Sequence, residues 1–566
     1  MAAALGFALL FFVLCWLYGW AFFAFCKRWL NLSPGGESPL QVLLAGMIVL
    51  TTLAAALSLT LPLDWRSLGI ILLGGAAIFF ALSRQGRIRL RLPDWRAWGW
   101  LQIAAGFLLA LALLTVLENS TRAVANPDTG IYHAQAIRWM EEYPAVPGLG
   151  NLHTRFAYNS HWLVLNAVFS LAFLGGRSLH LAGAMLFALA VVDFWNGVRN
   201  WTSGKRTAAH ALRLMLLPLA FYVLGSQISS PGTDLPVVLF LWMLAAQWLD
   251  GRSSSGNLMI FTGAIFLVTV KLSAAPFALL AVWIALRDSH RQPGRLTGWI
   301  MLGAALLLPW LARNVVLSGY LIYPLPALDL FLVDWKIPAA IAAREAEVIR
   351  AWARLPGEEI ERVLAMPLAV WAREWLSNLT FNQRGIVLAA AASPLAAAGM
   401  ALFLHLKKAS ISLEENRLLG LYAVALAGGV YWFNSAPDLR FGFGWLLLLI
   451  LLPVCWALAR LTHTRLARLR LVSLALLAGL IFIQAWFLAA SFEGRTFAQR
   501  WLLPVDYPHH ASEPCPIENA TVLCAAESSY TQCYYYPFPC IPKPVTGVEA
   551  RGTDWRDGFR SVEGRD

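Results

Sequence analysis

Long, nearly uncharged apolar runs recur along this chain and constrain its fold more than any other feature. The first, from about Ala4 to Phe25, contains no charged residue. A run of about 20 apolar residues can cross a bilayer as a helix, because only internal hydrogen bonds satisfy its backbone in lipid. Of the 566 residues 59% are hydrophobic and 13% are charged, and the charges are bunched between the runs. The pattern predicts a polytopic integral membrane protein.

These runs predict an all-α fold with about 14–15 transmembrane or half-spanning helices. The run 161–174 is short for a crossing, and we expect it to be a half-span or re-entrant helix. The expected segments are 4–26, 39–62, 67–83, 98–117, 161–174, 178–197, 209–226, 234–249, 257–271, 273–287, 296–317, 385–405, 416–433, 443–460 and 470–490.

Basic residues collect in short loops between the segments, and such loops stay on the cytoplasmic side. This orientation explains the net charge of +12 better than nucleic-acid binding does. It also places the polar regions 118–160, 318–384 and 491–566 on the extracytoplasmic side. The expected cytoplasmic loops are Lys27-Arg28, 84–96, 199–206, 287–295, Lys407-Lys408 and 460–470.

The alternation of apolar and polar stretches divides the chain into five regions. We expect N-terminal transmembrane helices over 1–97, a transmembrane core over 98–317, an extracytoplasmic loop over 318–384, C-terminal transmembrane helices over 385–490 and a Cys-rich tail over 491–566. The first polar region, 118–160, lies within the core.

The second polar region is expected to contain amphipathic helices. Apolar residues recur at helical spacing from Ile341 to Leu355 and from Ile360 to Trp375, with charges on the opposite faces. Helices of this kind lie on a membrane surface or pack on the rest of the protein, and the pattern leaves both readings open.

Four of the seven cysteines fall in the final tail. An even number in a small polar region favours two disulfides, with three possible connectivities, over a zinc site, because no CxxC pair is present. The tail would then be a small disulfide-containing extracytoplasmic unit. The four are Cys515, Cys524, Cys533 and Cys540, whereas Cys15, Cys26 and Cys455 lie in or beside the apolar segments and are expected to be packing residues.

The first polar region concentrates groups that can carry chemistry. Asp128 is expected to begin a short helix, on which Tyr132, Gln135 and Trp139 would share one face. Taken alone, Asp128 is more simply explained as a helix N-cap. The same region holds His133, His153, Arg155 and His161.

These histidines are most simply interfacial polar residues, and they lack the spacing of an HExxH metal site.

Five more charged residues lie at the expected extracytoplasmic ends of segments. Charged groups at membrane depth are costly and suggest a functional site. Individually, Lys271 and Arg313 could extend to the interface, and Asp438 could pair with Arg440. The occurrence of these four residues and Asp234 on one side of the membrane favours a shared site.

This layout resembles the GT-C superfamily of polytopic glycosyltransferases, and within it a family of large bacterial inner-membrane proteins. The likeness extends from about residue 98 onward. Its carrying segments are Asp128-Thr-Gly-Ile-Tyr-His133, Pro147-Gly-Leu-Gly-Asn-Leu-His153, Arg313-Asn314 to Pro324, Pro437-Asp438-Leu-Arg440-Phe and the Cys-rich tail.

The resemblance implies an inverting transfer of sugar from a polyprenyl phosphate to a glycan, lipid or protein acceptor, in a bacterial inner membrane with the large loops and tail periplasmic. Asp128 would act as general base, and Asp234 would match the second acid of the clan. No DD, DE or DxD pair occurs in the first polar region, so no motif supports a divalent metal, and the sequence leaves open whether the reaction uses one. The implied substrate-binding residues are Tyr132, His133, His153, Arg155, His161, Lys271, Arg313, Asp438 and Arg440.

Three other functions use similar features. A transporter or flippase of a lipid-linked glycan would need polar residues deep within several spans, whereas here the charges gather at one interface. A polysaccharide polymerase or ligase would also place Arg and His on an outer surface. A non-catalytic assembly scaffold is the third alternative.

Overall fold

The computed structural model describes residues 1–33, 36–84, 99–251, 253–406, 412–462, 470–492, 501–526 and 531–562. The expected basic loops 84–96, 407–408 and 460–470 lie wholly or mostly outside the described residues.

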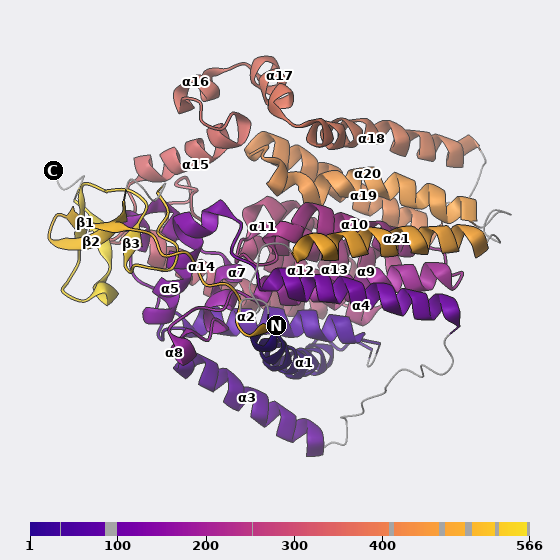
Figure 1. The fold of residues 1–566 in the computed structure, drawn as a ribbon, viewed down its shortest axis with the longest axis horizontal. Coiled ribbons are helices and arrows are strands. Elements are labelled where there is room, and N and C mark those ends of the chain that lie inside the picture. The colour runs from indigo at the N-terminus through magenta and orange to yellow at the C-terminus, as the bar shows by residue number, and fades with distance from the viewer. Residues whose placement is uncertain are drawn as a thin grey trace.

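Within the described part of the chain, twelve helices are long and apolar enough to cross a membrane. Most run side by side along one direction (Figure 1). The prediction of an all-α polytopic membrane protein is confirmed. These helices are α1 (Ala2–Trp29), α2 (Pro39–Leu57), α3 (Trp65–Arg84), α4 (Trp100–Ser120), α9 (Ala182–Thr202), α10 (Ala208–Leu224), α13 (Ala278–Arg291, after a 3-10 turn Leu272–Phe277), α14 (Gly294–Ser318), α18 (Phe381–Leu406), α19 (Leu413–Ser435), α20 (Leu439–Thr462) and α21 (Arg470–Ser491).

Three further apolar helices lie inside the bundle. All of α11 (Asp234–Asp250) except Asp250 is buried, and α12 (Ser254–Val270) packs against it. The expected segment 161–174 is divided: α7 (His161–Val168) has eight residues, all buried, and Leu171 at φ 53° separates it from α8 (Ala172–Gly175). A helix of eight residues is too short to cross a bilayer, as expected for a half-span.

Short helices cover one end of the bundle. The first polar region forms a π-helical turn (Thr129–His133), α5 (Ala134–Glu142), α6 (Leu149–Leu152) and a 3-10 turn (Thr154–Ala157). The two amphipathic stretches form α15 (Ala339–Arg354), α16 (Ile360–Ala365) and α17 (Leu368–Asn378). Trp371 and Trp375 are buried while Trp352 is 54% exposed, so these helices pack on the protein and also present an apolar surface.

The tail contains short strands that the sequence did not predict. β1 (Ser512–Ile517) and β2 (Ala520–Ala525) pair antiparallel, and β3 (Cys540–Ile541) joins β2 in parallel. β4 (Val548–Ala550) pairs with β5 (Phe559–Ser561). The prediction of two disulfides is confirmed, and the connectivity is Cys515–Cys524 and Cys533–Cys540. The other three cysteines are free and buried.

Candidate functional site

A cavity of about 380 Å³ lies where the first and second polar regions meet the helix bundle. Its walls come from the first polar region, from α15, and from the ends of α11, α12, α14, α19 and α20. Eight of the residues singled out in the sequence line it: Asp128, Tyr132, His133, Arg155, Asp234, Lys271, Asp438 and Arg440.

Asp128 does not cap a helix. Its side chain makes no capping hydrogen bond, and the Asn126 amide oxygen instead accepts the Asp128 backbone N–H at 3.0 Å. Its two carboxylate oxygens contact Arg155 at 3.4 Å and Arg440 at 2.8 Å. Burial acts to raise the pKa of Asp128, but Arg440 and the other nearby positive charges outweigh it and hold the pKa below its ordinary value. The carboxylate is therefore ionised at neutral pH.

Arg440 joins the site from a distant part of the chain. The turn before α20 folds locally, because the Asp438 carboxylate accepts the backbone N–H of Arg440 at 3.1 Å and its Nε–H at 3.0 Å. Trp432 and Trp375 fix this turn by donating to the carbonyls of Asp438 and Pro437, at 2.7 and 3.0 Å. The local pair leaves Nη1 of Arg440 aimed at Asp128.

A second ion pair joins Asp234 and Lys271. Asp234 is the first residue of α11, where the positive end of the helix dipole favours an acid. Lys271 has extended backbone between α12 and the next 3-10 turn, so the chain breaks at this residue. Its Nζ hydrogen-bonds the Asp234 carboxylate and lies 3.6 Å from the centre of the Phe441 ring. The Asp234 side chain is only 5% exposed, against 25% for Lys271.

The π-helical turn changes which residues share a face. We expected Tyr132, Gln135 and Trp139 on one face, but only Tyr132 lines the cavity, while Gln135 and Trp139 contact the tail. The expectation was wrong because residues in a π turn do not follow the 3.6-residue spacing.

His133, in the same π turn, is a neutral imidazole. Burial lowers its pKa to about 4. Neither ring nitrogen has a hydrogen-bond partner among the described residues. The ring stands 4.2 Å, centre to centre, from that of Tyr132, and the residue lines the cavity.

Glu345 on α15 connects the two polar regions and was not identified from the sequence. It accepts hydrogen bonds from Thr154, at 2.8 Å, and from Tyr158, and it lies 3.8 Å from Arg155. The helical spacing assigned Glu345 to the charged outer face of α15, yet it is 7% exposed. Its partners come from a loop whose position the sequence does not reveal.

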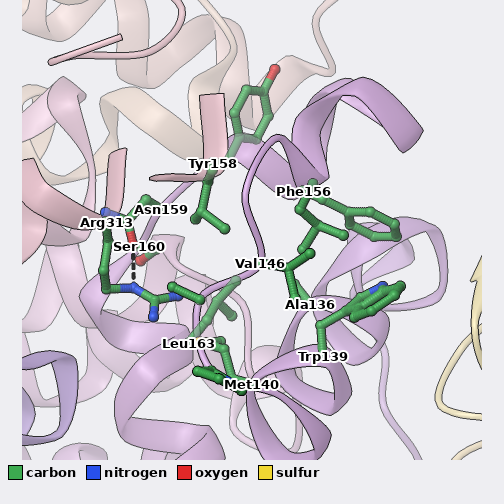
Figure 2. Close-up of a pocket in the computed structure, with 14 residues that line it drawn as sticks. Ala136, Trp139, Met140, Val146, Phe156, Tyr158, Asn159, Ser160, Leu163 and Arg313 are labelled. Carbon is green, nitrogen blue, oxygen red and sulfur yellow. Dashed lines mark hydrogen bonds between the residues drawn. The ribbon is translucent and has the colours of Figure 1, made fainter. Parts of the chain in front are cut away.

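Arg313 lies outside this cavity. It is 2% exposed, lines a separate space of about 20 Å³, and donates to the Asn159 side chain at 3.0 Å (Figure 2). Trp310 and Asn159 also exchange hydrogen bonds, at 2.6 and 2.7 Å. These contacts tie the chain entering α7 to α14, which is a structural role.

His153 and His161 also lie outside the cavity. His153 packs edge-on against Phe156 at 5.0 Å, and burial lowers its pKa to about 3. His161 is fully buried at the start of α7.

The cavity is amphipathic. Paired charges occupy the part near Asp128, while the wall formed by Val348, Ile349 and Trp352 of α15 and by Tyr431 of α19 is apolar or aromatic. No group of three or more His, Cys, Asp or Glu among the described residues is placed to hold a metal ion. Such a site suits a ligand with an anionic head and an apolar chain, because a phosphate can take over the cations from their carboxylates.

The chain is similar over part of its length to a curated transferase. It is 27% identical over 191 residues to the phospho-N-acetylmuramoyl-pentapeptide-transferase of Synechococcus sp. (strain CC9605). The match covers 28% of this chain and 51% of the relative, so the chain spans about half the length of the relative that it matches. No solved structure matches the chain significantly. Residues 1–447 match the family described as a domain of unknown function (DUF8201), and the protein belongs to that family.

Proposed function

We propose that the protein transfers a sugar from a polyprenyl-phosphate donor to an acceptor hydroxyl, at the end of the bundle where the cavity lies. The observation that carries the proposal is the convergence of Asp128, Lys271 and Arg440 on one amphipathic cavity. Elements far apart in the chain supply these groups, and a polyprenyl phosphate has the matching combination of charged head and apolar chain. The resemblance to GT-C glycosyltransferases supports the same function.

In this proposal Asp128 is the general base. The acceptor oxygen attacks the anomeric carbon, its proton passes to Asp128, and the carbon–oxygen bond to phosphate breaks with the electron pair left on the phosphate. Because the pKa of Asp128 is depressed, it is a weak base, which accepts the proton as the acceptor oxygen attacks. Lys271 and Arg440 stabilise the charge on the departing polyprenyl phosphate.

The remaining residues hold or orient these groups. Asp234 positions Lys271, Asp438 orients Arg440, and Arg155 neutralises Asp128. Tyr132 and His133 are placed to contact the sugar. We assign no substrate contact to Arg313, His153 or His161, because they lie outside the cavity.

We place the cavity on the extracytoplasmic face of a bacterial inner membrane. The described basic stretches 27–28, 199–206 and 287–295, which are expected in the cytoplasm, lie at the opposite end of the helices. The two disulfides of the tail suit an oxidising compartment. The apolar wall of α15 and α19 would receive the first isoprene units from the bilayer.

The similar transferase supports a second candidate within the same class. Its name describes the transfer of a phosphorylated sugar–peptide, so the phosphate travels with the sugar rather than remaining on the lipid. A phosphosugar transfer would use the same cations around the phosphate and would not need Asp128 as a base at a sugar hydroxyl.

The test uses the full chain purified in detergent, a polyprenyl-phosphate sugar labelled separately in phosphate and sugar, and an envelope extract as the acceptor source. We expect sugar label in the acceptor and phosphate label in the lipid, and a loss of about 10²–10⁴-fold in turnover for Asp128→Asn. Phosphate label in the acceptor would favour the second candidate.

The matched control is Asp329→Asn. Asp329 pairs with Lys336 on the second polar region, 48% exposed and outside the cavity. This variant should keep full turnover. Unchanged turnover in a folded Asp128→Asn protein would rule out Asp128 as the base.

A further inference from the structure

The disulfide-closed loop Cys533–Cys540 of the tail lies directly on the helix that follows Asp128. The backbone N–H groups of Cys533 and Tyr534 donate to the Gly130 carbonyl at 2.9 and 3.0 Å. A Cβ on Gly130 would stand 2.9 Å from the Tyr534 ring, so a larger residue at this position would require the ring to shift. The loop thus completes the hydrogen bonding of the π-helical turn, where the regular helical pairing is interrupted.

Gln135 is the centre of this contact. Its Nε2 donates to the carbonyls of Tyr534 and Pro537, at 2.9 and 2.7 Å, and its Oε1 accepts the Cys540 N–H at 3.0 Å. The side chain is fully buried. Three hydrogen bonds from one amide to one loop fix both the distance and the rotation of the helix relative to the tail.

The contact continues along the helix. Arg138 donates to the Tyr535 carbonyl at 2.9 Å, and its guanidinium lies 4.9 and 4.8 Å from the ring centres of Tyr535 and Phe538. The Tyr535 hydroxyl donates to Glu141 at 2.5 Å.

The tail therefore contacts one face of this helical segment. The other face carries Tyr132 and His133, which line the cavity together with Asp128. Any rotation of the segment about its axis moves both faces together.

We propose that the Cys533–Cys540 loop is a clamp that positions Asp128 for reaction, with Gln135 as its positioning residue. This inference rests on the proposed function for its activity readout. Productive geometry is exacting, since a misplacement of about 1 Å costs on the order of a hundredfold in rate. Lys271 and the apolar wall lie on other elements, so the phosphate and the lipid chain of the donor bind independently of the clamp, and only the contacts of Tyr132 and His133 with the sugar depend on it.

The test compares the double variant Cys533→Ser/Cys540→Ser and the isosteric Gln135→Glu with the wild type. Gln135→Glu keeps the size of the side chain, loses both donors and places a negative charge against two carbonyls. For both variants we expect a fall in kcat of about ten- to a hundredfold, a donor KM within about threefold, and faster amide hydrogen exchange over 126–143. A general loss of folding would instead raise exchange throughout the bundle.

The matched control is Cys515→Ser/Cys524→Ser, which removes the β1–β2 disulfide of the same tail but leaves the backbone pairing of β2 with β3 and the three hydrogen bonds of Gln135 in place. This control should keep wild-type exchange over 126–143 and wild-type kcat. The clamp is rejected if folded Gln135→Glu protein shows wild-type exchange in that segment and wild-type kcat. Should the wild type have no transferase activity, the proposed function fails, while the exchange measurement still tests the clamp.

Discussion

At the scale of single residues, the site is defined by one carboxylate held between two guanidinium groups. Asp128 and Arg440 are far apart in sequence, and each has a plain local explanation: a helix cap for the acid, a neighbouring acid for the arginine. The local explanation holds for Arg440, which does pair with Asp438, but a guanidinium has several donors. Another N–H group of Arg440 pairs with Asp128. The ion pair with the neighbouring Asp438 therefore does not prevent an ion pair with a residue far away in the sequence.

Replacing Arg440 should alter both rate and pH dependence. In Arg440→Gln we expect turnover to fall by about tenfold to a hundredfold, because the leaving phosphate loses a cation. Without Arg440 the pKa of Asp128 loses the largest of the influences that lower it and rises, so the acidic limb of the pH–rate profile moves to higher pH. Steady-state assays across pH measure both effects.

Arg362→Gln is the control, since Arg362 pairs with Glu358 on an exposed part of α16 and is 55% exposed. It should leave the profile unchanged. An acidic limb that does not move in Arg440→Gln would contradict the assignment of Asp128 to that limb.

Glu141 should make the stability of the tail contact depend on pH. Burial raises its pKa to about 7, despite the hydrogen bond from Tyr535. Between about pH 4.5 and 7 the folded state then binds more protons than the unfolded state, so stability falls as pH rises through this window. Glu141 therefore contributes a decrease of the thermal midpoint over this range, against the opposite contribution of His133 and His153, whose lowered pKa values make stability rise with pH up to about 6.5.

Glu141→Gln removes the Glu141 contribution and should make the slope of the midpoint against pH more positive than in the wild type, while Glu142→Gln, at a half-exposed neighbour, should not. Thermal unfolding in detergent at several pH values measures the difference. Equal slopes in all three proteins would show that Glu141 does not control the dependence.

At the scale of elements, breaks in regular helices place the functional groups. The π turn brings His133 and Tyr132 to the cavity, the break at Lys271 between α12 and α13 supplies a cation, and the turn before α20 supplies Arg440. Regular apolar helices bury their backbone and expose no polar group at this depth. The candidate site residues therefore lie at the points where helices begin or end.

The other end of the bundle has a buried ion-pair network that joins three helices. Arg213 of α10 donates to Asp193 of α9 at 2.8 Å and to both carboxylate oxygens of Asp250 of α11, at 2.8 and 2.6 Å. The Arg213 and Asp193 side chains are 8% and 5% exposed. Removing one partner of such a network leaves an uncompensated buried charge.

Arg213→Met should therefore destabilise the protein by about 3–5 kcal/mol, and adding Asp193→Asn should recover part of the loss. Arg344→Met, which removes an ion pair between Arg344 of α15 and Glu361 of α16 with side chains 44% and 62% exposed, should cost much less. Thermal melts of the detergent-solubilised variants measure these effects. A double variant no more stable than Arg213→Met alone would indicate that Asp193 is not the group left unpaired.

At the scale of the whole molecule, the first polar region, the second polar region and the tail meet at one junction. The Pro147 carbonyl accepts the Phe559 N–H at 2.9 Å, and the Asn151 amide donates to the Trp335 carbonyl at 2.8 Å. Asp334, the residue before Trp335, forms an ion pair with Arg551 of the tail at 3.0 Å. The segment from Pro147 to His153 thus connects the three regions to one another and does not line the cavity.

Gly148→Ala should disrupt this junction. Gly148 has φ 62°, and a Cβ would stand 2.1 Å from the Phe559 carbonyl oxygen. Gly204 is the matched control, because it has φ 86° but open space around the position of a Cβ. We expect Gly148→Ala to release the tail and increase its proteolysis, and Gly204→Ala to cost only backbone strain of about 1 kcal/mol.

Limited proteolysis read at the tail separates the two variants. Equal protection of the tail in both would show that the junction does not hold it.

The sequence by itself determined the membrane fold and the position of nearly every helix, because a run of apolar residues in lipid has one stable conformation whatever surrounds it. It also pointed to two disulfides in the tail and to Asp128, Asp234, Lys271 and Arg440 as unusual charges. Only the tertiary structure decided which of these charges meet, that Arg313, His153 and His161 stand apart, and that Glu345 is buried. It also decided that Gln135 binds the tail. Those contacts join segments hundreds of residues apart, and local physical rules carry no information about distances of that kind.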